Sequence, residues 1–218
     1  TAESIASEKP VFIMETQTDR RLRFFTSHGN CLIIGVDELP EARLTAKATN
    51  LNSLVQLEKG EEIVACFDEV KDDTLVFFTA LGSAKRTEGK GAGGVKCMKL
   101  DEGDRVIFAA QIADEGEILT ISDRGYAKRS LVFDYEIQGR NGKGLKTFDF
   151  KKNGSNGTAI AAALYVKEPY DIVIRQFHGE ETVVNTETVF IEQRPGKGML
   201  TVMALLDDIV IGAKKIKS

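Results

Sequence analysis

The stretch Gln138-Gly139-Arg140-Asn141-Gly142-Lys143-Gly144 contains a Gly-Lys-Gly step that recurs along the chain and indicates its fold class. The step stands also at Gly89-Lys90-Gly91 and Gly196-Lys197-Gly198, and a weaker copy, Ala46-Lys47-Ala48, precedes them. The four lysines are 43, 53 and 54 positions apart, and a strand-like apolar run follows each copy. A period of roughly 40–55 residues is typical of β-propeller-like arrays, in which each unit forms one small sheet.

Short segments rich in Val, Ile, Phe and Thr alternate with turns along the whole chain, without a long amphipathic helix pattern. When the repeats are overlaid, glycines stand at matching hairpin turns, where a positive φ is expected: Gly29, Gly82, Gly125 and Gly179. The pattern predicts an all-β array of about four blades, in units at approximately 10–68, 69–113, 114–166 and 167–216. Such units bury their faces only against neighbours, so residues 1–218 are expected to form one domain. The expected strands include Thr188–Ile191 and the apolar runs Val95–Leu100, Leu145–Phe150 and Met199–Leu206.

Composition indicates a globular protein with an uneven charge distribution. Hydrophobic residues make up 42% and charged residues 28% of the 218, and the net charge is −4. The charge nevertheless alternates with the repeat: residues 84–99 carry a net +4, residues 101–117 a net −5 and residues 124–152 a net +5. A basic face is therefore compatible with an acidic chain. The three cysteines, Cys31, Cys66 and Cys97, lack metal-site spacing and are expected to be reduced, buried thiols of a cytosolic protein.

The Gly-Lys-Gly steps do not match a P-loop, because no Ser or Thr follows the lysine. They are either solvated loops between blades or contacts to a phosphate backbone, and their repetition favours phosphate. The pairs Lys85-Arg86 and Lys128-Arg129 lie in a strand-like context and either contact a partner or protect a strand edge. His28 and His178 stand at predicted hairpins without a Cys or carboxylate at ligand spacing, so neither a metal site nor a catalytic set is expected.

The box-like stretch Gln138–Gly144 resembles the gyrase box, Q-R-R-G-G-K-G, of the C-terminal domains of DNA gyrase A subunits, and departs from it at the second and fourth places. Gln193-Arg194-Pro195-Gly196-Lys197-Gly198 is a shorter echo. The stretches Asp37–Arg43, Asp101–Asp104 and Gly125–Arg129 are also similar to that family. The ordered set covers nearly the whole chain, which thus resembles the C-terminal domain of a bacterial type IIA DNA topoisomerase A subunit, of gyrase or of topoisomerase IV.

This resemblance implies a β-pinwheel, a propeller-like array of four-stranded blades, whose basic outer rim binds, bends and wraps double-stranded DNA without reading its sequence. Strand-passing chemistry belongs to another part of the enzyme, so this fragment is not expected to be an enzyme by itself or to hold a cofactor. ATP and Mg²⁺ are implied for the full enzyme. Its other partners would be the remainder of the A subunit, together with the ATPase B subunit, in the cytoplasm at the nucleoid, without a membrane.

The residues expected to contact DNA are basic and lie on the repeated loops: Arg43, Lys47, Lys85, Arg86, Lys90, Lys128, Arg129, Arg140, Lys143, Lys146, Arg194 and Lys197. Topoisomerase IV is favoured over gyrase, because the best box is imperfect and lies in the third unit, and because four units are fewer than gyrase's usual six. The alternative is a protein-interaction propeller whose rim binds an acidic partner. Blade number, ring closure and wrapping handedness stay open.

Overall fold

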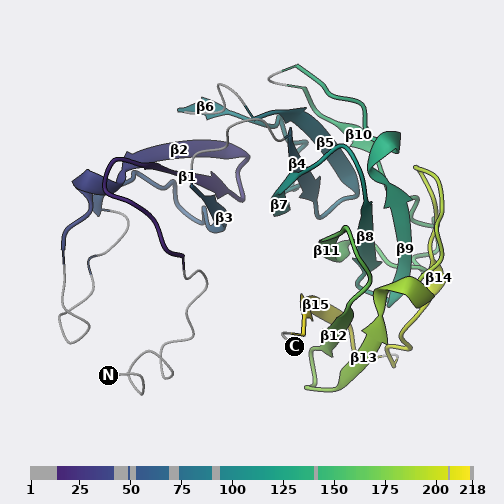
Figure 1. Cartoon of the computed structure of the whole chain (residues 1–218). Helices are drawn as coiled ribbons and strands as arrows, with labels where there is room; N and C mark the ends of the chain where they lie inside the picture. Colours follow the sequence, from purple (N-terminus) through teal and green to yellow (C-terminus); the bar gives the residue numbers. More distant parts are fainter. Residues whose placement is uncertain are drawn as a thin grey trace.

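The computed structural model describes residues 14–41, 49, 53–68, 74–89, 94–139, 142–205 and 207–216. Four antiparallel sheets follow one another in an open arc (Figure 1). Within these ranges, no helix is long and apolar enough to cross a bilayer. Five residues that the sequence assigned to the DNA-binding set or to the box lie outside the described residues: Arg43, Lys47, Lys90, Arg140 and Asn141.

Each sheet is one blade. The first has the order β3-β1-β2-β6, with β1 (Arg21–Thr26), β2 (Asn30–Gly35), β3 (Ile63–Phe67) and β6 (Val95–Lys96). The second has the order β10-β5-β4-β7, with β4 (Thr74–Thr79), β5 (Ser83–Glu88), β7 (Val106–Ile112) and β10 (Leu145–Lys146). The third has the order β11-β8-β9-β14, with β8 (Glu117–Ser122), β9 (Tyr126–Leu131), β11 (Ile160–Val166) and β14 (Met199–Leu200). The fourth has the order β13-β12-β15, with β12 (Asp171–Gln176), β13 (Glu181–Asn185) and β15 (Val210–Lys215).

The all-β propeller-like array predicted from the repeats is confirmed, with one feature that the repeats did not reveal. The outer strand of each of the first three blades comes from the following unit, because β6 pairs with β2, β10 with β5 and β14 with β9. Figure 1 shows β3, β7, β11 and β15 on the inner side of the arc and the exchanged strands β6, β10 and β14 on its outer side. The blades are thus linked by exchanged strands along the outer rim.

The core lies between the blades and follows the two-residue period of a strand. In β4, whose six residues are all buried, Leu75 and Phe77 pack toward the first blade, whereas Val76 and Phe78 pack toward the third. Phe25 of β1 meets Phe77 with ring centroids 5.4 Å apart. A central strand with both faces buried reads as a continuous apolar run, which is what Thr-Leu-Val-Phe-Phe-Thr presents.

The four hairpin glycines predicted from the overlay are confirmed, since Gly29, Gly82, Gly125 and Gly179 have φ values of 78°, 89°, 75° and 98°. The strand predicted at Thr188–Ile191 is wrong. A 3₁₀ helix, η4 (Thr186–Thr188), forms there because the Asn185 side chain accepts a hydrogen bond from the Glu187 N–H. Equivalent turns, η1 (Val36–Glu38) and η3 (Val132–Asp134), follow β2 and β9.

The apolar runs after the Gly-Lys-Gly steps are strands for only two residues each. After β6, the N–H groups of Cys97 and Met98 both point to the carbonyl oxygen of Gly29, at 2.8 and 3.3 Å. The chain thereby leaves the ladder and turns inward, where Met98 is fully buried. The expected longer strands are therefore wrong, because the second half of each run packs into the joint between two blades.

Candidate nucleic-acid interface

Two lysines of the predicted DNA-binding set, Lys85 and Lys128, are fully buried between blades. The Lys85 ammonium donates a hydrogen bond to the carbonyl oxygen of Cys97 at 2.6 Å. The Lys128 ammonium donates to Ser130 Oγ at 3.0 Å and to the carbonyl oxygen of Gln193 at 3.3 Å. Burial lowers the pKa of both groups, that of Lys128 to about 8. Both ammonium groups therefore bind protein oxygen atoms between the blades, and neither is exposed to a phosphate.

Their neighbours Arg86 and Arg129 are also joint residues. Arg86 donates from Nε to Thr74 Oγ1 at 2.8 Å and forms an ion pair with Asp114. Arg129 donates to Glu117 Oε2 at 2.6 Å. In both cases the guanidinium also donates to the carbonyl oxygen of the residue that follows a 3₁₀ turn of the next unit: Tyr135 for Arg86 and Val189 for Arg129.

The paired basics thus differ from their expected role, for a physical reason. In a propeller both faces of a strand pack against neighbouring blades, so the two-residue alternation does not turn either side chain outward. These four basic residues, Lys85, Arg86, Lys128 and Arg129, therefore lie outside the candidate interface.

The described residues of the box-like motif, 138–139 and 142–144, belong to a segment that we call a strap. The second strap, residues 137–148, begins where Ile137 bridges Arg86 and ends where Leu145 and Lys146 pair with β5. The third strap, residues 191–202, begins where Ile191 bridges Arg129 and ends where Met199 and Leu200 pair with β9. Each strap therefore begins and ends beside the same strand of the preceding blade, β5 for the second strap and β9 for the third.

The glycine before each exchanged strand explains part of the motif. Gly144 and Gly198 have positive φ values of 84° and 67°. A Cβ at Gly144 would lie 2.5 Å from the carbonyl oxygen of Ala84, and one at Gly198 would lie 3.1 Å from that of Ala127. Gly144 thus lies directly against the main chain of the preceding blade. Gln138, Gly139 and Gly142 lie on the same strap.

Exposed lysines remain on the exchanged strands and the straps. Lys143, Lys146 and Lys197 were in the predicted set, and Lys96 of β6 was not. Lys96 pairs with Asn30 as Lys146 pairs with Ser83, so the two lysines occupy the same position on successive blades. Aligning Gly94-Val95-Lys96 with Gly144-Leu145-Lys146 could have identified Lys96 from the sequence. We call Lys96, Lys143, Lys146 and Lys197 the rim lysines.

Two rim lysines have carboxylate partners. Lys143 pairs with Asp101, and Lys146 pairs with Asp149 at 2.5 Å. The hydrogen bond from Lys146 lowers the pKa of Asp149. Arg194, also from the predicted set, is only partly exposed, because it donates from Nε to the carbonyl oxygen of Asp134 at 2.8 Å and from Nη1 to that of Lys146 at 3.2 Å. Arg194 thus connects the third strap to the second.

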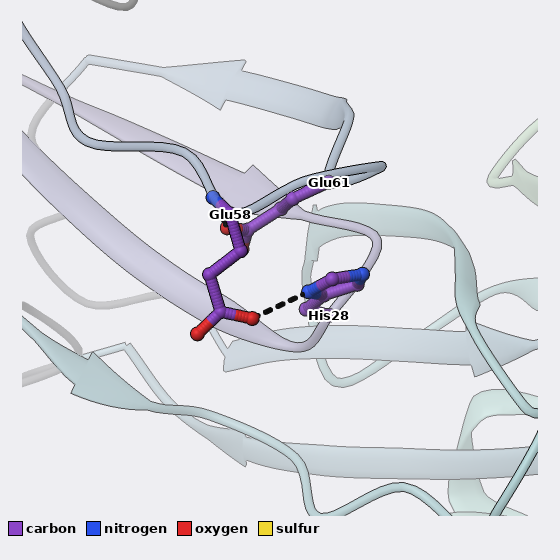
Figure 2. A group of neighbouring side chains, drawn as sticks. All are labelled: His28, Glu58 and Glu61. Atoms are coloured by element: carbon purple, nitrogen blue, oxygen red, sulfur yellow. Dashed lines mark hydrogen bonds and ion pairs between the residues drawn. The ribbon is translucent and has the colours of Figure 1, made fainter.

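A second polar cluster lies at the first hairpin, where His28 Nδ1 is 2.9 Å from Glu58 Oε2 and Glu61 lies beside them (Figure 2). The three residues offer ligand atoms within 4.8 Å of one another. His28 thus has a carboxylate partner that spacing along the sequence does not reveal, because the fold brings together residues 30 positions apart. The sequence could not show this contact without the blade's register.

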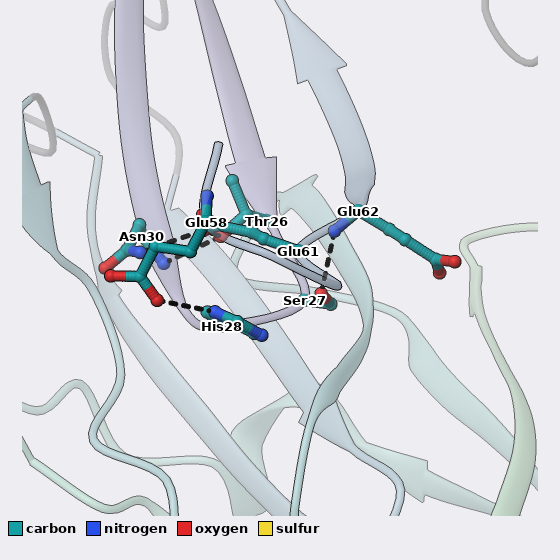
Figure 3. A network of polar contacts seen from close by, with 7 residues as sticks. All are labelled: Thr26, Ser27, His28, Asn30, Glu58, Glu61 and Glu62. Atoms are coloured by element: carbon teal, nitrogen blue, oxygen red, sulfur yellow. Dashed lines mark hydrogen bonds and ion pairs between the residues drawn. The ribbon is translucent and has the colours of Figure 1, made fainter. Parts of the chain in front are cut away.

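The contacts of Glu61 explain that cluster without a metal ion. Glu61 Oε1 accepts hydrogen bonds from Thr26 Oγ1 and, at 2.8 Å, from Asn30 Nδ2, and Oε2 accepts one from the Glu58 N–H at 2.9 Å (Figure 3). Burial alone would raise the pKa of Glu61, but these hydrogen bonds outweigh it and lower the pKa. The acidic turn is thus a clamp on the hairpin. The second blade has a similar contact, in which Asp104 accepts from the Leu81 N–H at 2.9 Å.

Comparisons with known proteins agree with this architecture. The family described as DNA gyrase C-terminal domain, beta-propeller, matches residues 24–67, 73–113 and 116–156. The A subunit of DNA gyrase from Chlamydia pneumoniae is 26% identical over 173 residues, covering 75% of this chain and 20% of that protein. The chain thus spans about a fifth of the length of this curated relative.

Solved structures show the same fold. The C-terminal domain of DNA topoisomerase IV superposes with a TM-score of 0.83 at 20% identity, covering 99% of this chain and 72% of that one. The DNA gyrase A C-terminal domain superposes with a TM-score of 0.61 at 18% identity, covering 93% and 84%. Because the family match covers more than half of the sequence, the chain belongs to the beta-propeller family of DNA gyrase C-terminal domains, found in the A subunits of type IIA DNA topoisomerases.

Proposed function

We propose that this domain binds duplex DNA along its outer rim and bends it, without reading base sequence, as part of a type IIA topoisomerase A subunit. The observation that carries the proposal is the repeated placement of exposed lysines on the exchanged strands and straps: Lys96, Lys143, Lys146 and Lys197. Lysine contacts to phosphate position a protein on DNA but carry no direct sequence information.

The acidic net charge does not oppose this function. The ion pairs of Lys143 with Asp101 and of Lys146 with Asp149 are solvent-exposed, and such pairs contribute only about 0–1 kcal/mol. A phosphate can therefore replace the carboxylate at little cost. Each phosphate neutralised releases condensed counterions, which adds about 0.9 to the slope of log K against log salt concentration.

The arc supports a bending role. Successive blades present equivalent strands along the outer side of the arc, so DNA that follows the rim lysines curves around the domain (Figure 1). Bending 20–30 base pairs by 40–90° costs on the order of 1–6 kcal/mol. Several weak phosphate contacts in a row are needed to offset that cost, and the repeat provides them.

We further propose that the domain is of the topoisomerase IV type. The better superposition on the topoisomerase IV domain, the open arc and the imperfect box at Gln138–Gly144 support this assignment, although the named sequence relative is part of a gyrase. The remainder of the A subunit, the ATPase B subunit, ATP and Mg²⁺ would complete the enzyme in the cytoplasm. In that arrangement this domain guides DNA and leaves strand passage to the rest of the enzyme.

A bending measurement tests the proposal. A duplex of about 40 base pairs, labelled at both ends with a donor and an acceptor, is titrated with the domain at low salt. We expect saturable binding with increased energy transfer, and weaker binding with less energy transfer in the variant Lys143→Ala plus Lys197→Ala. The matched control, Lys59→Ala plus Lys167→Ala, removes two exposed lysines away from the straps and should behave like the wild type.

Binding of DNA without any increase in energy transfer would overturn the bending role. Failure to bind DNA at low salt, combined with capture of an acidic protein in a manner that requires the rim lysines, would favour the protein-interaction alternative.

A further inference from the structure

The fourth blade has an outer edge that differs from the outer edges of the other three. Within the described part of the chain, β13 receives no exchanged strand, whereas β2, β5 and β9 each receive one. Figure 1 shows β13 at the end of the arc, beyond the last exchanged strand β14. Unpaired strand edges offer a row of main-chain donors and acceptors to another strand.

The hairpin glycines of the second and third blades accept main-chain hydrogen bonds from a strap, and the described residues provide no such donor to the glycine of the fourth blade. The carbonyl oxygen of Gly82 accepts from the N–H groups of Thr147 and Phe148, at 2.8 and 3.3 Å, and that of Gly125 accepts from those of Thr201 and Val202, at 2.9 and 3.1 Å. Gly179 is the matching glycine of the fourth blade. It is exposed, and a Cβ there would have no atom within 4 Å among the described residues.

A cavity on the fourth blade lies at the position that the Arg194 side chain occupies on the third blade. On the third blade, Arg194 of the strap donates to the carbonyl oxygens of Asp134 and Lys146. Fifty-four positions further along the repeat, their equivalents are Thr188 and Leu200. Both line a surface cavity of about 410 Å³, whose other walls are Val183, Val184, Asn185, Phe190, Met199 and Thr201.

Exposed apolar side chains mark the same place. Val183 and Phe190 are each 62% exposed, and Met199 and Leu200 are about half exposed. Val183 stands where Arg129 stands in the third blade, and Arg129 exchanges two backbone hydrogen bonds of 2.8 Å with Phe190 and Glu192. The N–H and carbonyl groups of Val183 therefore point away from β12, toward an incoming chain.

We propose that the outer edge of the fourth blade is a receptor for a strap-type segment, with the sequence pattern Ile-x-x-Arg-x-Gly-Lys-Gly-apolar-x-Thr-apolar. Its Ile would bridge Val183, its Arg would enter the cavity beside Thr188 and Leu200, and its Gly-apolar-x strand would pair with Glu181 and Glu180. The described residues of the two straps of this chain, within 137–148 and 191–202, already pair with the second and third blades. The occupant is therefore a strap of another polypeptide segment, and not one of these two straps from a second copy.

Charge selects between strap sequences. Lys146 of the second strap pairs with Ser83, and the equivalent of Ser83 on the fourth blade is the exposed Glu180. A strap with Lys at this position places opposite charges across from each other, which stabilises antiparallel strand pairs. A strap with Leu there, as in the third strap, gains nothing from Glu180. We expect the receptor to prefer the Gly-Leu-Lys form.

Peptide binding tests the receptor independently of DNA. A fluorescein-labelled peptide with the sequence of residues 137–148 is titrated with the 218-residue protein, and anisotropy is recorded. We expect saturable binding that is several-fold tighter than that of the peptide of residues 191–202. A peptide with Leu145 replaced by Pro should not bind, because Pro cannot donate the edge hydrogen bond.

Variants of the edge locate the site. Val183→Pro removes the outward N–H and should weaken peptide binding at least tenfold, whereas Val183→Thr keeps that N–H and should retain binding. If Val183→Pro fails to fold, Glu180→Lys replaces it and should remove the preference for the Gly-Leu-Lys peptide. Hydrogen exchange should show protection of β13 amides when the peptide is bound.

Binding that is unchanged in Val183→Pro, or no binding of the 137–148 peptide at millimolar concentration, would overturn the receptor. Self-association of the peptide-free protein that Val183→Pro abolishes would assign the edge to a second copy and also overturn it. Peptide binding and DNA bending are measured in separate experiments. Either the receptor or the bending proposal can therefore fail without affecting the test of the other.

Discussion

The ammonium group of Lys128 donates a hydrogen bond to the main-chain carbonyl oxygen of Gln193, 3.3 Å away, and thereby holds the third strap onto the third blade. A lysine in a basic, repeated stretch is in this case part of a joint. The result divides the basic residues of the chain into two classes. Buried cations tie blades together, and exposed cations on the straps remain available for a polyanion.

Because of Lys128, the stability of the domain should change with pH in the alkaline range. Burial lowers its pKa from 10.5 to about 8, so between these values the unfolded chain binds more protons than the folded one. Stability therefore rises as the pH increases from about 8 toward 10.5, by at most about 3 kcal/mol at 1.36 kcal/mol per pKa unit. Urea unfolding at pH 7.5 and pH 9.5 measures the rise. Lys128→Met should reduce it, whereas Lys152→Met, at an exposed site, should not.

Replacement of Arg129 should destabilise the domain far more than replacement of an exposed arginine. Its ion pair with Glu117 is largely buried, with side chains 12% and 18% exposed, whereas the pair of Arg175 with Glu181 is 50% exposed on both sides. Removing one partner of a buried pair costs about 3–5 kcal/mol, and an exposed pair contributes about 0–1 kcal/mol. Chemical denaturation of Arg129→Ala and Arg175→Ala should show this difference. Equal losses would show that the Arg129 joint is not a principal link between the blades.

Glu61 makes the first blade sensitive to acid. Its hydrogen bonds lower its pKa in the folded state, so its contribution is fully present above the unfolded pKa and is lost as the pH falls through the folded pKa. Thermal unfolding at pH 7 and pH 3.5 should show a smaller acid-induced decrease of Tm for Glu61→Gln than for the wild type. Glu62→Gln, which changes an exposed neighbour, serves as the control. An unchanged acid response in Glu61→Gln would contradict the clamp.

Strand exchange can be tested with two matched glycines. Gly125 and Gly179 both have positive φ, so replacement by Ala strains the backbone similarly at each. At Gly125 the new Cβ would also collide with the main chain of Val202, whereas the structure has open space at Gly179. Gly125→Ala should therefore lower Tm several degrees more than Gly179→Ala does. Similar decreases would show that the third strap does not seat on the hairpin.

The sequence predicted the elements whose signal is local. The hairpin glycines and the all-β repeat follow from turn chemistry and two-residue periodicity. The strand exchange could not be predicted, because β6, β10 and β14 have only two residues each and their partners lie in another unit. A two-residue strand is too short to show a two-residue periodicity, and its sequence does not indicate which distant strand it pairs with.

The candidate interface was predicted only in part, for a related reason. Lys143, Lys146 and Lys197 are exposed as expected, but Lys85 and Lys128 have the same residue type at similar spacing and are buried. The carbonyl that receives the Lys128 ammonium comes from a residue 65 positions away. Because such partners are far apart in the sequence, the sequence does not show which lysines and arginines are buried between the blades.

The proposed function requires that the rim lysines, and not the buried basic pairs, contact DNA. The most direct test measures the salt dependence of duplex binding for the wild type, Lys143→Ala plus Lys197→Ala, and Lys128→Met, each confirmed as folded by circular dichroism. We predict that the rim variant reduces the slope of log K against log salt concentration by about 2, since each phosphate contact contributes about 0.9. Lys128→Met should leave the slope unchanged. A reduced slope in Lys128→Met with an unchanged slope in the rim variant would contradict DNA contact by the rim lysines.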